Sequence, residues 1–159
     1  MKILVVYYSR TGRTRKLAQE IHQKIESEIN EIHDRKTRKG ILGWLSAGRD
    51  AGQRKETEIK GDISPPSSFD IIVIGSPTWN GGLSVPILTY VNRYLDDLKH
   101  VAVFTTGDGE DLDAIEELRN ILGKKVFSMS HFVREKEIDT MSYNEKLTKF
   151  ITQIKSFAR

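Results

Sequence analysis

The first 25 residues already restrict how this chain can fold. Residues 3–8 are apolar and rich in branched side chains, which is typical of a buried strand. Residues 14–25 carry their apolar side chains on one face of a predicted helix. Those side chains are Leu17, Ala18, Ile21 and Ile25. A short polar turn joins the two segments, so we expect a strand that passes directly into a helix, as in an α/β protein.

The turn at residues 9–14 has the composition of an anion-binding site. It contains the hydroxyls of Ser9, Thr11 and Thr14 and the glycine Gly12. A glycine accepts backbone dihedrals that a Cβ would disfavour. The first amides of a helix have no partner inside the helix, and the helix dipole adds positive charge beside them. An ordinary capped turn needs only one hydroxyl, so this turn favours a phosphate site.

The spacing within the turn also limits which phosphate it can bind. It lacks the GxxxxGK[ST] pattern of nucleotide triphosphatases and the GxGxxG pattern of dinucleotide-binding folds. Hydroxyls without a lysine suit one terminal monophosphate better than a polyphosphate with magnesium.

The remainder of the chain alternates between predicted strands and predicted helices. Further strands are predicted at 28–32, 69–75, 101–105 and 126–133. Helices are predicted from Ser84, over 112–122 and from the capping box Ser142-x-x-Glu145. This alternation predicts an α/β fold with a doubly wound five-stranded parallel sheet, order 2-1-3-4-5, and helices on both faces.

Three loops of unusual composition follow the first, third and fourth predicted strands. They cover residues 9–14, 76–83 and 106–110. In a doubly wound sheet the carboxyl ends of parallel strands meet at one edge, and ligands bind where the strand order reverses. We therefore expect the three loops to form one binding site.

With these loops, nearly the whole chain resembles the flavodoxin family. Ser9-x-Thr11-Gly12-x-Thr14 is similar to that family's phosphate loop for flavin mononucleotide (FMN), residues 76–81 to its second flavin loop, and residues 105–109 to its third. The segment 40–51 resembles one found in short, single-domain members often labelled flavodoxin or quinone-reductase-like. The resemblance implies that FMN contacts Ser9, Arg10, Thr11, Gly12, Arg13, Thr14, Pro77, Thr78, Trp79, Asn80, Gly81, Gly82, Thr106, Gly107 and Asp108.

Roles for several of these residues follow from the resemblance. Trp79 would form one wall for the flavin ring, and an Asn80-Gly81 carbonyl would accept a hydrogen bond from reduced flavin N5. The alternative for Trp79 is packing in the core, but its neighbours describe an exposed, tight turn. Asp108 would bind the pyrimidine edge or cap the next helix, although Asp111 suits that cap better. No catalytic side chain is assigned, because the flavin carries the chemistry.

Other side chains give weaker signals. Arg15 is expected to be a solvated side chain at the start of the helix, whereas Arg10 or Arg13 could attract anionic substrates. His22 and His33 lack paired ligand spacing, so no metal site is expected. His131, in the last predicted strand, is expected to be buried or at an edge and not catalytic.

The whole chain, 1–159, is predicted to be a single flavodoxin-like domain with a basic, Trp-containing insertion at about 35–60. The insertion is either a solvated connection or a flap for a partner or substrate. Trp44 favours burial against the body or against a second subunit.

Composition excludes several classes of protein. The chain has 0 cysteines, which excludes a disulfide framework and thiol catalysis and makes the cytoplasm the expected location. No apolar run approaches the ~20 residues of a membrane span. The net charge of +3 falls short of a nucleic-acid-binding signature.

Three functions remain open at this stage. The first is an FMN-dependent reductase that takes hydride from NAD(P)H and passes it to a quinone or similar acceptor. The second is a one-electron carrier with a redox partner protein, although such carriers usually present an acidic surface. The third is a non-redox binding module on the same fold. The sequence leaves open whether the chain forms a homo-oligomer.

Overall fold

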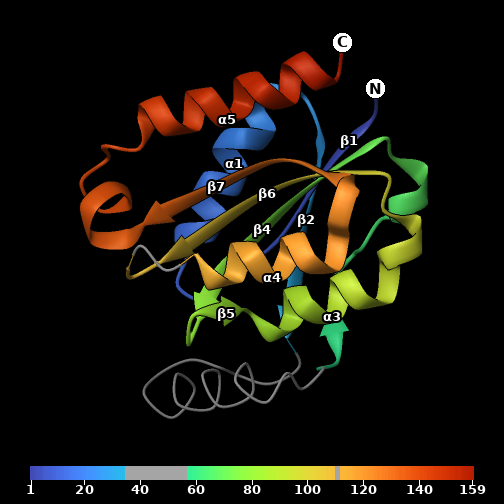
Figure 1. Ribbon diagram of the computed structural model, residues 1–159, viewed down its shortest axis with the longest axis horizontal. Coiled ribbons are helices and arrows are strands. Elements are labelled where there is room, and N and C mark those ends of the chain that lie inside the picture. Colours follow the sequence, from blue (N-terminus) through green and yellow to red (C-terminus); the bar gives the residue numbers. More distant parts are fainter. Residues whose placement is uncertain (35–56, 110–111) are drawn as a thin grey trace.

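The computed structural model describes residues 1–34, 57–109 and 112–159, and its centre is a β-sheet (Figure 1). In these residues the strand order is β3-β2-β1-β4-β6-β7, with β5 paired to β4. The strands are β1 (Ile3–Tyr8), β2 (Glu28–Asp34), β3 (Ile59–Lys60), β4 (Ile71–Trp79), β5 (Gly82–Leu83), β6 (His100–Gly107) and β7 (Val126–Val133).

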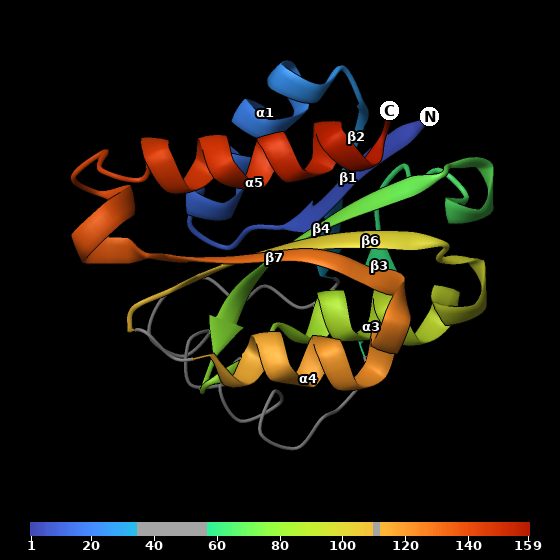
Figure 2. The same cartoon turned by 45° about the horizontal axis from the view of Figure 1, so that its top comes forward.

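Helices cover both faces of the sheet (Figure 2). Helices α1 (Arg13–Ile25) and α5 (Asn144–Phe157) lie on one face, and α3 (Val85–Tyr94) and α4 (Asp113–Leu122) lie on the other. Single 3₁₀ turns occur at Pro66–Ser68, Leu95–Asp97 and Gly123–Lys125. One π-helical turn, Arg134–Ile138, connects β7 to α5.

The two faces bury separate hydrophobic clusters. In β1, Leu4 and Val6 pack on the α3/α4 side, whereas Val5 and Tyr7 pack on the α1/α5 side. Successive side chains of a strand point to opposite faces, so a strand covered on both sides must be apolar throughout. This requirement explains why all six residues of β1 are buried.

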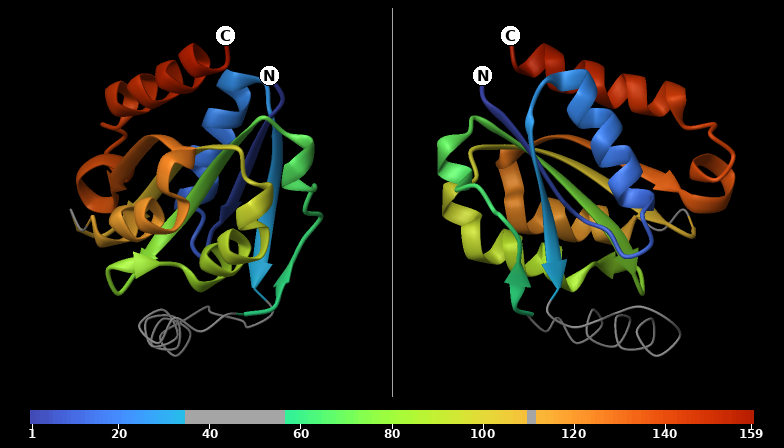
Figure 3. Two further views of the ribbon diagram at one scale, coloured as in Figure 1. Left: turned by 45° about the vertical axis from the view of Figure 1, so that its right-hand side comes forward. Right: turned by 180° about the vertical axis from the view of Figure 1, so that it is seen from behind.

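The predicted fold class is confirmed. The five long strands pair in parallel in the expected order, here β2-β1-β4-β6-β7. The two short strands were not predicted, and both pair antiparallel, β3 with β2 and β5 with β4 (Figure 3). Most of the predicted insertion, including Trp44, lies outside the described residues. Its end, at β3, returns to the sheet beside β2.

The arrangement of the strands positions a site. The carboxyl ends of β1, β4 and β6 lie at one edge of the sheet, at the reversal of strand order between β1 and β4. The N- and C-termini lie close together at the opposite end (Figure 1).

Candidate functional site

The loop between β1 and α1 has the features of an anion site. Gly12 precedes the helix with φ +96°, a left-handed conformation that favours glycine. The Gly12 N–H donates to the hydroxyl of Ser9 at 3.1 Å, and Gly12 has no side chain that could cap the helix. The amides of the first turn of α1 are therefore left for a ligand, with the positive end of the helix dipole behind them.

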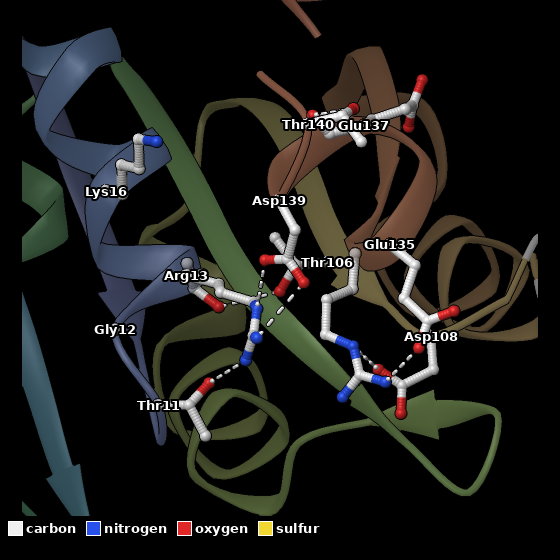
Figure 4. Close-up of polar contacts among 12 residues, drawn as sticks. Thr11, Gly12, Arg13, Lys16, Thr106, Asp108, Glu135, Glu137, Asp139 and Thr140 are labelled. Atoms are coloured by element: carbon white, nitrogen blue, oxygen red, sulfur yellow. Dashed lines mark hydrogen bonds and ion pairs between the residues drawn. The ribbon is translucent and has the colours of Figure 1, made fainter. Parts of the chain in front are cut away.

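The arginines around this loop have different partners. Arg13 donates through Nε to Asp139 at 3.0 Å and through a guanidinium nitrogen to Thr11 at 3.3 Å (Figure 4). That bond from Arg13 is the main cause of a lowered pKa for the Asp139 carboxyl. Arg15 is exposed at the start of the helix, as expected, and also forms an ion pair with Glu31 of β2 at 2.6 Å. Arg10 lies in the loop and is half-buried.

The end of β6 joins the three predicted loops. The hydroxyl of Thr106 lies 2.9 Å from the hydroxyl of Thr14, and both side chains are buried. A Cβ on Gly107 would lie 2.3 Å from the hydroxyl oxygen of Thr78, in the second loop. Only a glycine permits that approach. The three loops therefore converge through direct contacts, as the sequence predicted.

The second loop is a β-hairpin. Strand β4 continues through Trp79 and pairs antiparallel with β5, Thr78 opposite Leu83 and Trp79 opposite Gly82. The two residues between them, Asn80 and Gly81, have φ of +49° and +79°. Positive φ at both central residues is the signature of the type I′ hairpin, for which Asn-Gly is the preferred sequence. The prediction of a tight turn is confirmed, but strand pairing extends further into the loop than expected.

The expected exposure of Trp79 was wrong. Its side chain is 6% exposed and belongs to the core cluster on the α3/α4 face. Its ring packs edge-to-face on Tyr8, with ring centroids 5.4 Å apart. The tight turn is formed by Asn80 and Gly81, which follow Trp79 in the chain, so the composition of the turn does not predict the exposure of Trp79. The contact between Trp79 and a flavin remains a prediction.

Asp108, in the third loop, points toward the turn after β7. Its carboxylate accepts from Nε of Arg134 at 3.1 Å (Figure 4). Leu112, not an aspartate, occupies the position before α4, and no side chain caps that helix there. The alternative interpretation, that Asp108 caps α4, is therefore wrong, and Asp111 lies outside the described residues. A role for Asp108 at the pyrimidine edge remains a prediction.

Sequence reasoning missed one residue that connects to the third loop. His131 of β7 is 8% exposed, and both of its ring nitrogens are engaged. Nδ1 lies 2.7 Å from the Thr105 hydroxyl, and Nε2 lies 2.8 Å from the carbonyl oxygen of Gly109. A nitrogen facing a carbonyl must carry hydrogen, so Nε2 donates to Gly109. The burial of His131 was predicted, but its contacts join strands distant in the sequence and give no local signal.

The site can now be matched to a type of ligand. The donors that suit a monophosphate are the free amides in the first turn of α1, the hydroxyls of Ser9, Thr11 and Thr14, and the guanidinium of Arg13. The hairpin and the third loop lie beside it, joined through Thr106 and Gly107. A doubly wound parallel sheet with such loops at its switch point defines a nucleotide-binding α/β protein.

The family is shown by comparison with known sequences. The model of the family described as Flavodoxin matches residues 2–154, and the chain therefore belongs to the flavodoxin family. No curated protein matches the sequence.

Solved structures give the same result for the fold. A flavoprotein from Lactobacillus acidophilus NCFM, solved in complex with FMN, is 25% identical, with a TM-score of 0.73 over 92% of this chain and 98% of that one. A flavodoxin from the domain Archaea is 15% identical, with a TM-score of 0.63 over 100% of both chains. Oxidised Flavodoxin 1 from Bacillus cereus is 18% identical, with a TM-score of 0.57 over 98% of both chains.

Two features are absent from the described residues, 1–34, 57–109 and 112–159. None of their helices is both long enough and apolar enough to cross a membrane. Nor do three or more histidine, cysteine, aspartate or glutamate side chains gather there in a group that could hold a metal ion.

Proposed function

We propose that this chain binds FMN at the carboxyl edge of its sheet and works as an NAD(P)H-dependent reductase of quinones or similar acceptors. The observation that carries the proposal is the start of α1, where a left-handed Gly12 leaves the helix amides beside the hydroxyls of Ser9 and Thr11. A solved relative from Lactobacillus acidophilus is a flavoprotein in complex with FMN.

Each part of the site has a distinct task in this proposal. The first loop holds the terminal phosphate, with Arg13 kept nearby by Asp139. The Thr14–Thr106 contact fixes the distance between the first and third loops. The hairpin and Trp79 border the ring, and Asp108 lies at its pyrimidine edge. When bound, the flavin supplies the transfer of electrons or hydride, and the protein orients it and tunes its potential.

Titration of the purified protein with FMN tests the binding site. Removing both hydroxyls in Ser9→Ala/Thr11→Val is expected to weaken FMN binding at least tenfold, because hydrogen bonds to a charged group contribute about 1.5–3 kcal/mol each. Thr152→Val/Ser156→Ala removes two exposed hydroxyls from α5 and serves as the matched control. A wild-type protein that takes up no FMN at micromolar concentrations contradicts the proposal.

The reductase activity requires a separate experiment, because two solved relatives are flavodoxins and a one-electron carrier is the second candidate. Under anaerobic conditions, the FMN-loaded protein is mixed with NADH or with NADPH, and a quinone is then added. We expect nucleotide oxidation that continues until the quinone is consumed. A protein that accepts electrons only from a reductase partner is a carrier, which excludes the reductase. The net charge of +3 favours the reductase, because carriers of this family usually present an acidic surface.

A further inference from the structure

A groove runs along β7, the edge strand of the described sheet, on the side away from β6. In Figure 2, β7 lies between α5 above and α4 below, and residues from all three elements line the groove. Its volume is about 770 Å³. We call it the β7 groove. The first loop and the hairpin do not contribute to it, so it is distinct from the proposed phosphate site.

Apolar side chains from three elements line the β7 groove. They are Leu112, Ile115, Met129, Val133 and Phe150. Leu112 is 58% exposed, which makes it one of the few large apolar side chains that the described surface leaves open to water. Burying this surface under a ligand would be favourable.

Basic side chains line the same groove. Arg119 comes from α4, Lys136 from the π-helical turn, and Lys146 and Lys149 from α5, and all four are exposed. Among the described residues that line the groove, Glu137 is the one acid. The described lining is therefore positive overall, and a positive, apolar surface favours an occupant that is both acidic and apolar.

The carboxylate of Glu137 already has partners within the protein. Its carboxylate accepts the N–H of Val133 at 2.6 Å and pairs with the ammonium group of Lys146. Lys146 also donates to the carbonyl oxygen of His131 at 3.0 Å. These side chains satisfy two outward-facing backbone groups of β7, a device that protects edge strands from pairing with other strands.

Among the described residues, Arg119, in the last turn of α4, and Lys149 of α5 have no such partner. Arg119 contacts the sulfur of Met129 at 3.7 Å, and within the described part of the chain neither Arg119 nor Lys149 forms an ion pair with a carboxylate. They extend from α4 and from α5, so one charge is available on each side of the edge strand.

We propose that the β7 groove is the docking site for an extended acidic segment of a partner protein, in which Asp or Glu alternates with apolar residues. Successive side chains of an extended segment point to opposite sides, so apolar ones can face the floor while acidic ones face outward. The long, exposed side chains of Arg119 and Lys149 can then reach these acidic groups from the two helices. A second copy docked through its own β7 groove would bring the same cations against Arg119 and Lys149, and that repulsion disfavours such a symmetric dimer here. The inference does not depend on FMN.

The groove also borders the proposed flavin site. His131 is part of its lining, and the same side chain donates to Gly109 of the third loop. A segment docked along β7 therefore lies one side chain away from that loop.

A labelled synthetic peptide tests this proposal directly. The probe is a fluorescein-labelled octapeptide of alternating glutamate and leucine, and its binding to the full chain is followed by fluorescence anisotropy. We expect saturable binding that weakens with added salt, because the contacts are exposed ion pairs. The variant Arg119→Glu/Lys149→Glu should weaken it about tenfold, since each exposed ion pair contributes little by itself but reversal replaces attraction by repulsion at both positions.

The matched control is Lys124→Glu/Lys155→Glu. These exposed lysines lie next to α4 and on α5, outside the groove lining, and the variant has the same net charge as the first. It should bind the peptide within twofold of wild type. Equal weakening in both variants would mean attraction to overall charge and would overturn the proposal.

Nuclear magnetic resonance of the unmodified protein provides a second readout. Addition of the peptide should shift the amide signals of residues 129–133 and of the facing parts of α4 and α5. Shifts centred on residues 9–14 would instead place the acidic peptide at the anion site and overturn the proposal. A dimer, detected by sedimentation, whose formation prevents binding of the peptide would assign the groove to a second copy and would likewise overturn it.

Discussion

Gly109 is held by a side chain that the sequence did not connect with the third loop. The imidazole of His131 donates through Nε2 to the Gly109 carbonyl and faces the Thr105 hydroxyl through Nδ1. The hydrogen bond from Nε2 connects the third loop to β7. His131 is therefore a positioning residue for the third loop.

Two substitutions at His131 separate its two hydrogen bonds. His131→Gln places an amide nitrogen close to the Nε2 position and retains the donor to Gly109. His131→Asn is shorter and reaches only Thr105. One neutral hydrogen bond contributes about 1 kcal/mol, so in the Asn variant we expect about fivefold faster amide exchange at residues 107–109 and a matching loss of FMN affinity. The Gln variant should lie closer to wild type. Equal effects of the two variants would assign His131 a packing role only.

Individual residues were predicted well where their signal is local. Gly12 was expected to adopt an unusual backbone conformation and has φ +96°. Trp79 was misjudged, because its burial depends on Tyr8, some 70 residues earlier. His131 and Thr105 are likewise brought together only by the pairing of β6 with β7. A single sequence carries no record of such contacts.

The β4–β5 hairpin shows how one dipeptide determines an element. Asn80 and Gly81 both adopt positive φ, and the N–H of Leu83 donates to Glu117 of α4 at 3.2 Å, which ties the hairpin to the helix layer. Proline fixes φ near −65°, so Gly81→Pro would break the hairpin. That variant cannot report separately on the orientation of the peptide beside the flavin.

Substitutions at Asn80 measure the conformational requirement without removing the turn. Left-handed φ costs most side chains about 1–2 kcal/mol, whereas asparagine and glycine tolerate it. We expect Asn80→Ala to lower the free energy of unfolding by about 1 kcal/mol and Asn80→Gly to change it by a few tenths. Urea unfolding monitored by circular dichroism measures both values. If the alanine variant is as stable as the glycine variant, the turn does not depend on positive φ at this position.

Element boundaries were predicted less well than element types. The capping box proposed at Ser142 is wrong, because Tyr143 precedes α5 and the Ser142 hydroxyl donates to the carbonyl of Lys136. The π-helical turn at Arg134–Ile138 uses that serine to close its own loop. Competition between two local partners for one hydroxyl cannot be resolved from spacing alone.

The overall architecture of the molecule can be predicted from local patterns in the sequence. Five apolar segments alternating with amphipathic ones predict the parallel sheet, its order and its two helix layers, because right-handed crossovers leave few alternatives. The short strands β3 and β5 were missed, since two residues are too few for a periodic pattern. The β7 groove was missed because Arg119 and Lys149 belong to different helices and meet only across the folded edge strand.

The stability of the whole molecule should fall in alkaline solution. Burial, together with Glu31, raises the pKa of Tyr7 to about 12, and burial with a hydrogen bond to Glu20 raises that of Tyr143 to about 12. The ordinary pKa of a tyrosine hydroxyl is 10.0. Between pH 10 and pH 12 the unfolded chain therefore loses protons that the folded chain retains, so deprotonation favours unfolding. The stabilisation is complete below pH 10 and disappears as the pH rises toward 12.

Urea midpoints at pH 8, 10 and 11 should show this decline, and Tyr7→Phe should make it shallower because phenylalanine has no proton to lose. An equally steep decline in that variant would exclude Tyr7 as a source of the alkaline instability.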